Sequence, residues 1–194
     1  MRLGVLVSGR GSNLAAMLDA RLDVAIVISN RSGVPALDVA AAHGVPSHVL
    51  RRGEFIDASA RDEAIGRLLA AAGIGLAVLA GYDQLLRPSY FAAFGGRTIN
   101  VHPSLLPAHG GAGMMGMAVH RSVLSCGDAE TGVTIHEVTP ELDAGAILAQ
   151  ARVPVLAGDD AESLAARVLA EEHRLLVESV RRLSGAIATE VATA

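Results

Sequence analysis

The sequence predicts an α/β protein with a Rossmann-like, doubly wound and mostly parallel sheet. Through the first half of the chain, short apolar runs alternate with alanine- and leucine-rich segments of helical spacing. Such alternation is typical of a parallel sheet whose crossover connections are helices. Later in the chain, two alternating segments are joined by about seven residues, which predicts an antiparallel C-terminal ribbon at one edge of the sheet. A long final helix completes the predicted fold.

The predicted elements follow one another along the chain without an internal repeat or a linker. Strands are predicted at Leu3–Val7, Val24–Ser29, Val49–Leu50, Leu76–Leu79, from Thr98, at Thr131–Val138 and at Ala146–Val155. Helices are predicted at Leu14–Leu18, Pro35–Ala42, Ala58–Ala72, Met117–Leu124 and Asp159–Leu183, and Gly185–Ala194 is expected to fray. The unbroken apolar character of Leu76–Leu79 is typical of a central strand.

Composition excludes several classes of function. Hydrophobic residues make up 51% of the 194 residues, yet no apolar run approaches the roughly 20 residues of a membrane helix. The net charge of −4 and the lack of long basic runs argue against binding to nucleic acid. All 16 basic residues are arginine, which excludes a Walker A lysine and a lysine Schiff base. The first apolar run is too short for a signal peptide, so a cytoplasmic location is expected.

An amide and an imidazole are expected to project together from one strand end within Thr98–Pro107, TINVHPSLLP. Asn100 and His102 lie two residues apart and therefore share a face of a strand, and the prolines prevent a helix from following. The carboxyl ends of strands in an α/β sheet form the usual ligand crevice. On these two residues alone, a core histidine with a turn asparagine is an equally good interpretation.

Asp143 lies in the ELDAG turn between the two late strands, from which it could fold back over His102. A carboxylate beside an imidazole favours the imidazolium, which can donate a proton or stabilise an oxyanion. Asn100 would donate a neutral hydrogen bond to the same oxygen. Together the three side chains suit attack on a carbonyl group without a covalent nucleophile, although an aspartate in such a turn is more often structural.

The turn Gly9–Asn13 presents backbone N–H groups and a positive helix end to an anion. Its pattern lacks the third glycine of the dinucleotide fingerprint, and Asn30-Arg31 stands where an acidic residue would follow the second strand. A phosphate is therefore favoured over a pyrophosphate, with a tight turn that binds no ligand as the alternative.

Neither a metal site nor a hydrolytic serine is expected. The histidines have no H-E-x-x-H spacing, and the single cysteine excludes a cysteine-based zinc site and an internal disulfide. No serine lies in a G-x-S-x-G elbow.

Three segments resemble the phosphoribosylglycinamide formyltransferase family: SGRGSNL at Ser8–Leu14, INVHPSLLP at Ile99–Pro107 and ELDAGAILAQ at Glu141–Gln150. The likeness continues through VPVLAGD and the AEEH at Ala170–His173, so it covers nearly the whole chain in order. HPSLLP with a later D-x-G is shared by hydrolases and transferases that use 10-formyltetrahydrofolate. SGRGSNL is more specific, because it belongs to the member whose acceptor carries a phosphate.

The resemblance implies that the amine of 5-phosphoribosylglycinamide attacks the formyl group of the co-substrate 10-formyltetrahydrofolate in de novo purine (IMP) biosynthesis, without a metal. Asn100, His102 and Asp143 match the catalytic trio of the family. His102 would donate the proton, Asn100 would hold the formyl oxygen, and Asp143 would keep His102 protonated and ordered. The expected acceptor contacts are Gly11, Ser12, Asn13 and Glu172. The expected folate contacts are Arg61, Asp83, Gln84, Leu85, Leu86 and Asn100.

The resemblance also implies one formyltransferase domain over residues 1–194, with a phosphate-binding half at 1–100 and a catalytic and folate-binding half at 101–194. The expected partners are small molecules, with neither nucleic acid nor membrane, and the chain is expected to act as a monomer or homodimer. Two departures stand out. Many relatives carry a methionine–arginine pair in place of Asp83-Gln84, and the loop His109–Met117 replaces a shorter stretch that contains proline. This loop is long and glycine-rich enough to act as a flap.

Two other functions remain open from the sequence. The first is a formyltetrahydrofolate hydrolase, in which water replaces the amine, although that relative normally bears an extra N-terminal domain and this chain starts at its first strand. A methionyl-tRNA formyltransferase would need a C-terminal RNA-binding domain, so length disfavours both. The second is a non-catalytic nucleotide-binding module that uses only the Gly9–Asn13 turn and leaves the trio unexplained.

Overall fold

The computed structural model describes residues 1–192, with side chains through residue 185. Its strands are β1 (Leu3–Val7), β2 (Val24–Ser29), β3 (Ser47–Val49), β4 (Leu76–Leu79), β5 (Arg97–His102), β6 (Glu130–Glu137) and β7 (Ile147–Pro154). Its α-helices are α1 (Ser12–Asp19), α2 (Pro35–Ala42), α3 (Ala58–Ala71), α4 (Pro88–Ala93), α5 (Met117–Cys126) and α6 (Ala161–Ala192). A short 3₁₀ helix, η1 (Arg52–Glu54), precedes α3.

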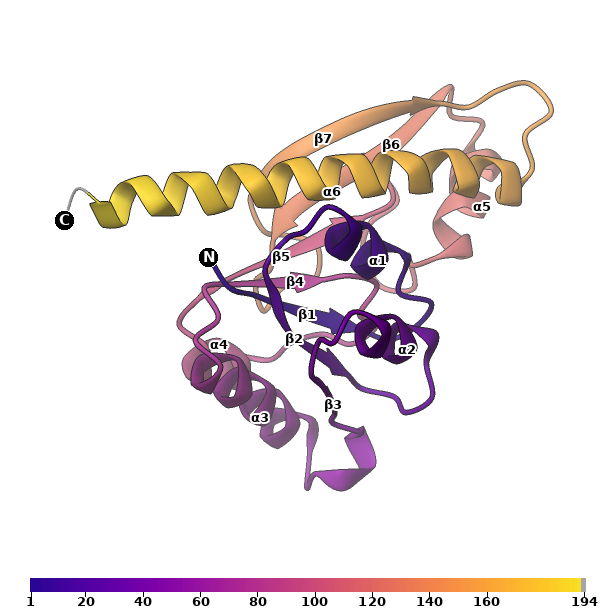
Figure 1. Ribbon diagram of the computed structural model, residues 1–194. Coiled ribbons are helices and arrows are strands. Elements are labelled where there is room, and N and C mark those ends of the chain that lie inside the picture. Colours follow the sequence, from indigo (N-terminus) through magenta and orange to yellow (C-terminus); the bar gives the residue numbers. More distant parts are fainter. Residues whose placement is uncertain (193–194) are drawn as a thin grey trace.

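The seven strands form one sheet in the order β3-β2-β1-β4-β5-β6-β7 (Figure 1). Strands β1 to β5 pair in parallel, whereas β6 pairs antiparallel with β5 and β7 antiparallel with β6. The prediction of a doubly wound sheet with an antiparallel ribbon at its edge is confirmed. Strand β4 is the middle strand, as its apolar sequence predicts.

Helix α6 differs from its predicted bounds at both ends. The Asp160 carboxylate accepts a hydrogen bond from the backbone N–H of Ser163 at 2.8 Å, which makes Asp160 the N-cap. The helix therefore begins at Ala161 and not at Asp159. The helix then continues through Gly185 to Ala192, so the expected fraying of this stretch is wrong, and residues 193–194 lie outside the described residues. A single glycine costs a helix only about 1 kcal/mol, which flanking helix-forming residues outweigh.

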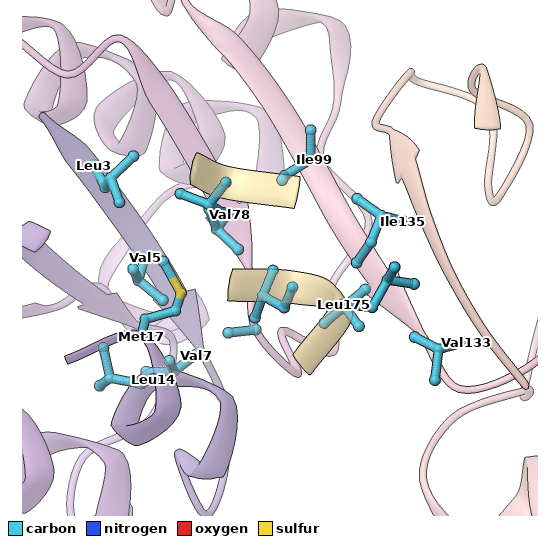
Figure 2. Close-up of a cluster of buried hydrophobic side chains, with 14 of the residues drawn as sticks. Leu3, Val5, Val7, Leu14, Met17, Val78, Ile99, Val133, Ile135 and Leu175 are labelled. Carbon is cyan, nitrogen blue, oxygen red and sulfur yellow. The ribbon is translucent and has the colours of Figure 1, made fainter. Parts of the chain in front are cut away.

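Two hydrophobic cores cover the two faces of the sheet. Alternate side chains of a strand point to opposite faces, and Val5 and Val7 accordingly join one core while Leu6 joins the other. The first core packs α1, α2, α5 and α6 against the sheet, and Figure 2 shows part of it around Met17 and Leu175. The second core packs α3 and α4 against the opposite face (Figure 1).

The chain order creates a crevice next to β1. Strand β1 lies between β2 and β4, so the loops that follow β1 and β4 leave their strands at the point where the winding reverses direction. Ligands of doubly wound folds bind at this switch point, outside the carboxyl ends of the strands. The same edge of the sheet carries the end of β5, where Asn100 lies opposite His136 and His102 opposite Thr134 of β6.

Replacement of Gly66 by alanine is expected to destabilise the fold, because α3 and α4 approach closely there. A Cβ atom at Gly66 would lie 2.7 Å from the carbonyl oxygen of Tyr90 and 2.8 Å from the Cβ of Ala93. We expect this overpacking to cost about 1–3 kcal/mol of unfolding free energy, measured by urea denaturation, despite the better helix propensity of alanine.

Gly185→Ala is the matched control, since among the described residues no atom outside the neighbouring turns of α6 lies within 4 Å of the added Cβ. We expect the control to be as stable as the parent chain or more so. An unchanged or increased stability of Gly66→Ala would contradict the close α3–α4 contact.

Candidate active site

A small cavity of about 60 Å³, open to solvent on one side, lies at the carboxyl ends of β4 and β5. Five aliphatic residues contribute to its wall: Leu79, Leu85, Leu86, Val138 and Leu142. Its polar lining includes Gln84, Asn100, His136 and Asp143. These residues come from β4, β5, β6 and the loops after β4 and β6, so the cavity depends on the pairing of all three strands.

Asn100 is held by its cross-strand neighbour His136, which is 2% exposed. The Nδ1–H of His136 donates to the carbonyl oxygen of Glu137 at 2.8 Å, and its Nε2 accepts a hydrogen bond from Nδ2 of Asn100 at 3.1 Å. Burial lowers the pKa of His136, although the bond to Glu137 and the charge of Asp143 oppose the shift. His136 is therefore neutral at pH 7. The second N–H of the Asn100 amide remains available to an oxygen atom of a ligand.

Asp143 lies between His136 and the glycine-rich loop. Its Oδ1 is 3.7 Å from Nε2 of His136, and its Oδ2 accepts a hydrogen bond from the backbone N–H of Gly111 at 2.8 Å. The φ angle of Asp143 is +53°, a left-handed conformation that aspartate adopts more readily than most residues. Because His136 is neutral, it does not compensate the negative charge of Asp143.

His102 is 5% exposed and contacts the same loop. Its Nε2 lies 2.9 Å from the carbonyl oxygen of His109, and this oxygen can only accept, so Nε2 carries a proton and donates it. The structure thus brings His102 and Asp143 to two neighbouring backbone groups of one segment, His109–Gly111. Their direct contact, expected from the sequence, stays a prediction.

The residues that the sequence predicts to bind the acceptor substrate come together from opposite ends of the chain. Gly11 has φ of +80°, and a Cβ atom there would lie 2.7 Å from the Cα of Ala36, so only glycine fits. Nδ2 of Asn13, at the start of α1, donates to Oε2 of Glu172 on α6 at 2.9 Å. Burial raises the pKa of Glu172, against the bond from Asn13 and the charge of Arg10. Among the described residues, the buried Oδ1 of Asn13 has no hydrogen-bond partner.

Of the predicted folate contacts, Gln84, Leu85, Leu86 and Asn100 line the cavity. Arg61 is 1% exposed, pairs with Asp62 at 2.7 Å and lies 3.4 Å from Oε1 of Gln84, so it reaches the cavity through Gln84. Its direct contact with a folate stays a prediction.

Asp83 turns away from this cavity toward the end of β2. It accepts a hydrogen bond from Asn30 at 2.7 Å and pairs with Arg31, while its own N–H donates to Oγ of Ser8 at 3.0 Å. Burial opposes ionisation of Asp83, but the bonds from Asn30 and Gln84 and the charge of Arg31 outweigh it and lower the pKa. Ser8 in turn donates to Oδ1 of Asn30 at 2.7 Å, so the ends of β1, β2 and β4 share one polar network.

Sequence reasoning missed His136 as a partner of Asn100. The alternation of Thr131–Val138 puts Thr134, His136 and Val138 on one face, which was the available signal. The pairing register between β5 and β6 decides which of the three lies opposite Asn100. A register shift of two residues would place Thr134 or Val138 there in place of His136. The pairing of β6 with β7 is also irregular between Ile135 and His136, and such bulges are common beside active sites.

Two features are absent from the described part of the chain. Its His, Cys, Asp and Glu side chains form no group of three that could hold a metal ion. None of its helices combines the length and the apolar character needed to cross a membrane.

Comparison with known proteins gives a consistent result. The family model described as formyl transferase matches residues 1–180. Phosphoribosylglycinamide formyltransferase of Escherichia coli (strain K12) is 37% identical over 181 residues, which cover 90% of this chain and 83% of that protein. The trifunctional purine biosynthetic protein adenosine-3 of Drosophila pseudoobscura pseudoobscura is 39% identical over 180 residues, and this chain spans 13% of its length.

Solved structures show the same likeness. Glycinamide ribonucleotide transformylase 1 from Symbiobacterium toebii superposes with a TM-score of 0.87 at 42% identity, covering 93% of this chain and 86% of that chain. Phosphoribosylglycinamide formyltransferase from Brucella melitensis gives a TM-score of 0.85 at 38% identity, covering 94% of each chain. The chain described here belongs to the formyl transferase family.

Proposed function

We propose that this chain transfers the formyl group of 10-formyltetrahydrofolate to the amine of 5-phosphoribosylglycinamide, a reaction of de novo purine biosynthesis. One observation carries the proposal: Asn100 and Asp143 face one cavity at the end of β5, and His102 and Asp143 bind the same backbone segment. This is the set of groups that formyl transfer without a covalent nucleophile requires. The names of the similar proteins support the choice of the two substrates.

The acceptor would bind beside β1. The turn at Gly11 exposes the first N–H groups of α1, which suit a phosphate. Glu172 and the unpartnered Oδ1 of Asn13 are hydrogen-bond acceptors, so they suit the hydroxyl and N–H groups of a ribosyl glycinamide. The folate would bind in the cavity, whose apolar wall suits a flat ring system and whose polar groups suit the edges of that ring.

The chemistry follows from the charges of the site. The amine lone pair attacks the formyl carbon, and the carbonyl electrons move to the oxygen, where Asn100 and a protonated His102 would stabilise them. Collapse of this tetrahedral intermediate breaks the bond to the folate nitrogen, which keeps the electron pair and takes up a proton. The amine loses one proton in the same reaction. Asp143 would supply the negative charge of the site, because neutral His136 does not compensate it.

We also propose that residues 1–194 act as one formyltransferase domain on small molecules, in the cytoplasm, as a monomer or homodimer. The cavity supports a single domain, because it draws Gln84 and Asn100 from the predicted half 1–100 and His136 and Asp143 from the predicted half 101–194.

The direct test is to incubate the purified chain with both substrates and to follow formylated 5-phosphoribosylglycinamide by mass spectrometry. Formate release that does not require the acceptor would identify a hydrolase instead. Binding of the acceptor without turnover would identify a nucleotide-binding module.

His102→Ala and Asp143→Asn are each expected to lower kcat by about 10²–10⁴-fold, the usual contribution of a general acid or base. Affinity for both substrates, measured by calorimetry, should change little, because these groups act on the reacting atoms. His48→Ala, at an exposed histidine of β3, is the matched control and should retain the parent rate. Near-normal rates for His102→Ala and Asp143→Asn would contradict the roles proposed for these two residues in formyl transfer.

The dephosphorylated acceptor, glycinamide riboside, is expected to be a poor substrate. A charge-assisted hydrogen bond contributes about 1.5–3 kcal/mol, so kcat/KM should fall by at least about 10-fold when the phosphate is absent. Steady-state kinetics with both acceptors measures the ratio. Equal kcat/KM values would show that the turn at Gly11 binds no phosphate.

Glu172→Gln is expected to stabilise the chain at pH 7 while raising KM for the acceptor. Burial raises the pKa of Glu172, so the folded chain holds its proton more tightly than the unfolded chain. Stability therefore falls as pH rises from the ordinary glutamate pKa of 4.5 through the higher pKa of Glu172 in the folded chain. Thermal unfolding at pH 4 and pH 7 should show a higher Tm for the variant only at pH 7. A lower Tm at pH 7 would contradict this account.

A further inference from the structure

The segment His109–Gly111 joins two side chains of the candidate active site. The carbonyl oxygen of His109 accepts the Nε2–H of His102 at 2.9 Å, and the N–H of Gly111 donates to Asp143 at 2.8 Å. Two backbone groups of one short segment thus fix an imidazole and a carboxylate that come from β5 and from the loop after β6. Any movement of this segment would move both groups.

The sequence of the loop gives it little stability of its own. Four of the eight residues at 109–116 are glycine, the residue that loses the most conformational freedom on folding. Gly110 is packed closely, since a Cβ atom there would lie 2.6 Å from Cδ2 of Leu106. His109 has φ of +52°, a conformation that is sparsely populated by non-glycine residues and persists where the surroundings hold it.

The His109 ring has a hydrogen-bond partner at each of its two nitrogens. Its Nε2 lies 2.6 Å from Oδ2 of Asp128, and its Nδ1 lies 2.9 Å from Oγ of Ser122 on α5. The ring is largely buried, with 12% of its side chain exposed. Both bonds survive in either charge state of the ring, because the Ser122 hydroxyl can donate or accept while Nε2–H donates to the carboxylate.

We propose that His109 is a positioning residue for His102. Its ring, fixed by Asp128 and Ser122, holds the carbonyl oxygen that orients the His102 imidazole and defines which of its nitrogens carries the proton. The inference rests on the proposed function, since it assigns His102 a part in that reaction. Asp128 and Ser122 reach the reacting groups only through His109 and His102, so their contribution is orientation.

The test compares Asp128→Ala, which removes the ring's acceptor, with Asp128→Asn, which keeps an oxygen in its place. Glu130→Ala is the matched control, because it removes an exposed carboxylate two residues away that pairs with Arg152. We expect Asp128→Ala to lower kcat by about 10- to 100-fold, since small misplacements of reacting groups have effects of this size, with little change in KM for either substrate. Asp128→Asn should recover most of kcat, and Glu130→Ala should match the parent chain.

A second measurement needs no turnover. ¹⁵N NMR of the histidine rings, with the His102 signals assigned by their loss in His102→Ala, reports which nitrogen carries the proton. At a pH where the His102 ring is neutral, we expect the Nε2–H tautomer of His102 in the parent chain, in Asp128→Asn and in Glu130→Ala, and a mixture of both tautomers in Asp128→Ala. Should Asp128→Ala not fold, the same two measurements on Ser122→Ala, which removes the ring's other partner, decide the question.

The outcomes separate this inference from the proposed function. If the parent chain forms product and Asp128→Ala retains its kcat, the positioning role is wrong and the function stands. If the parent chain forms no product from the two substrates, the function is wrong, and the NMR comparison alone decides the inference. Unchanged His102 signals in Asp128→Ala would then overturn it, and altered signals would support it.

Discussion

The antiparallel pairing of β5 with β6 is the constraint on which the candidate active site depends. It brings His136 opposite Asn100. The hydrogen bond between them occupies one N–H of the asparagine amide and leaves the other N–H free for a ligand. The loop that follows β6 carries Asp143, which lines the same cavity.

The site separates the groups that carry charge from those that set geometry. Burial keeps His136 neutral, so it orients Asn100 without adding a positive charge next to Asp143. The neighbouring glycine-rich loop contributes backbone groups, which hold His102 and Asp143 through single hydrogen bonds. Such an arrangement ties the positions of one imidazole and one carboxylate to the conformation of a single backbone segment.

The sequence predicts most of the fold and part of the site. The bounds of Val24–Ser29, Pro35–Ala42 and Leu76–Leu79 are confirmed, because local apolar patterns and helix signals determine them. The placement of Asn100 and Asp143 at one cavity also follows from strand ends and loops. The partners of His102 and of Asp143 do not, because they depend on the conformation of a loop whose glycines leave no local pattern. Burial of Arg61 beneath Gln84 likewise depends on tertiary packing.

The polar network at the ends of β1, β2 and β4 has a thermodynamic consequence. Asp83 follows β4 beside the cavity, and its N–H is bonded to Ser8, three residues before the turn at Gly11. Asn30 bonds to both Asp83 and Ser8, so the three strand ends form a closed ring of hydrogen bonds. A ligand that ordered one side of this ring would lower the entropy cost of ordering the other side. By linkage the effect would be reciprocal, so each of two ligands would raise the affinity for the other by the same factor.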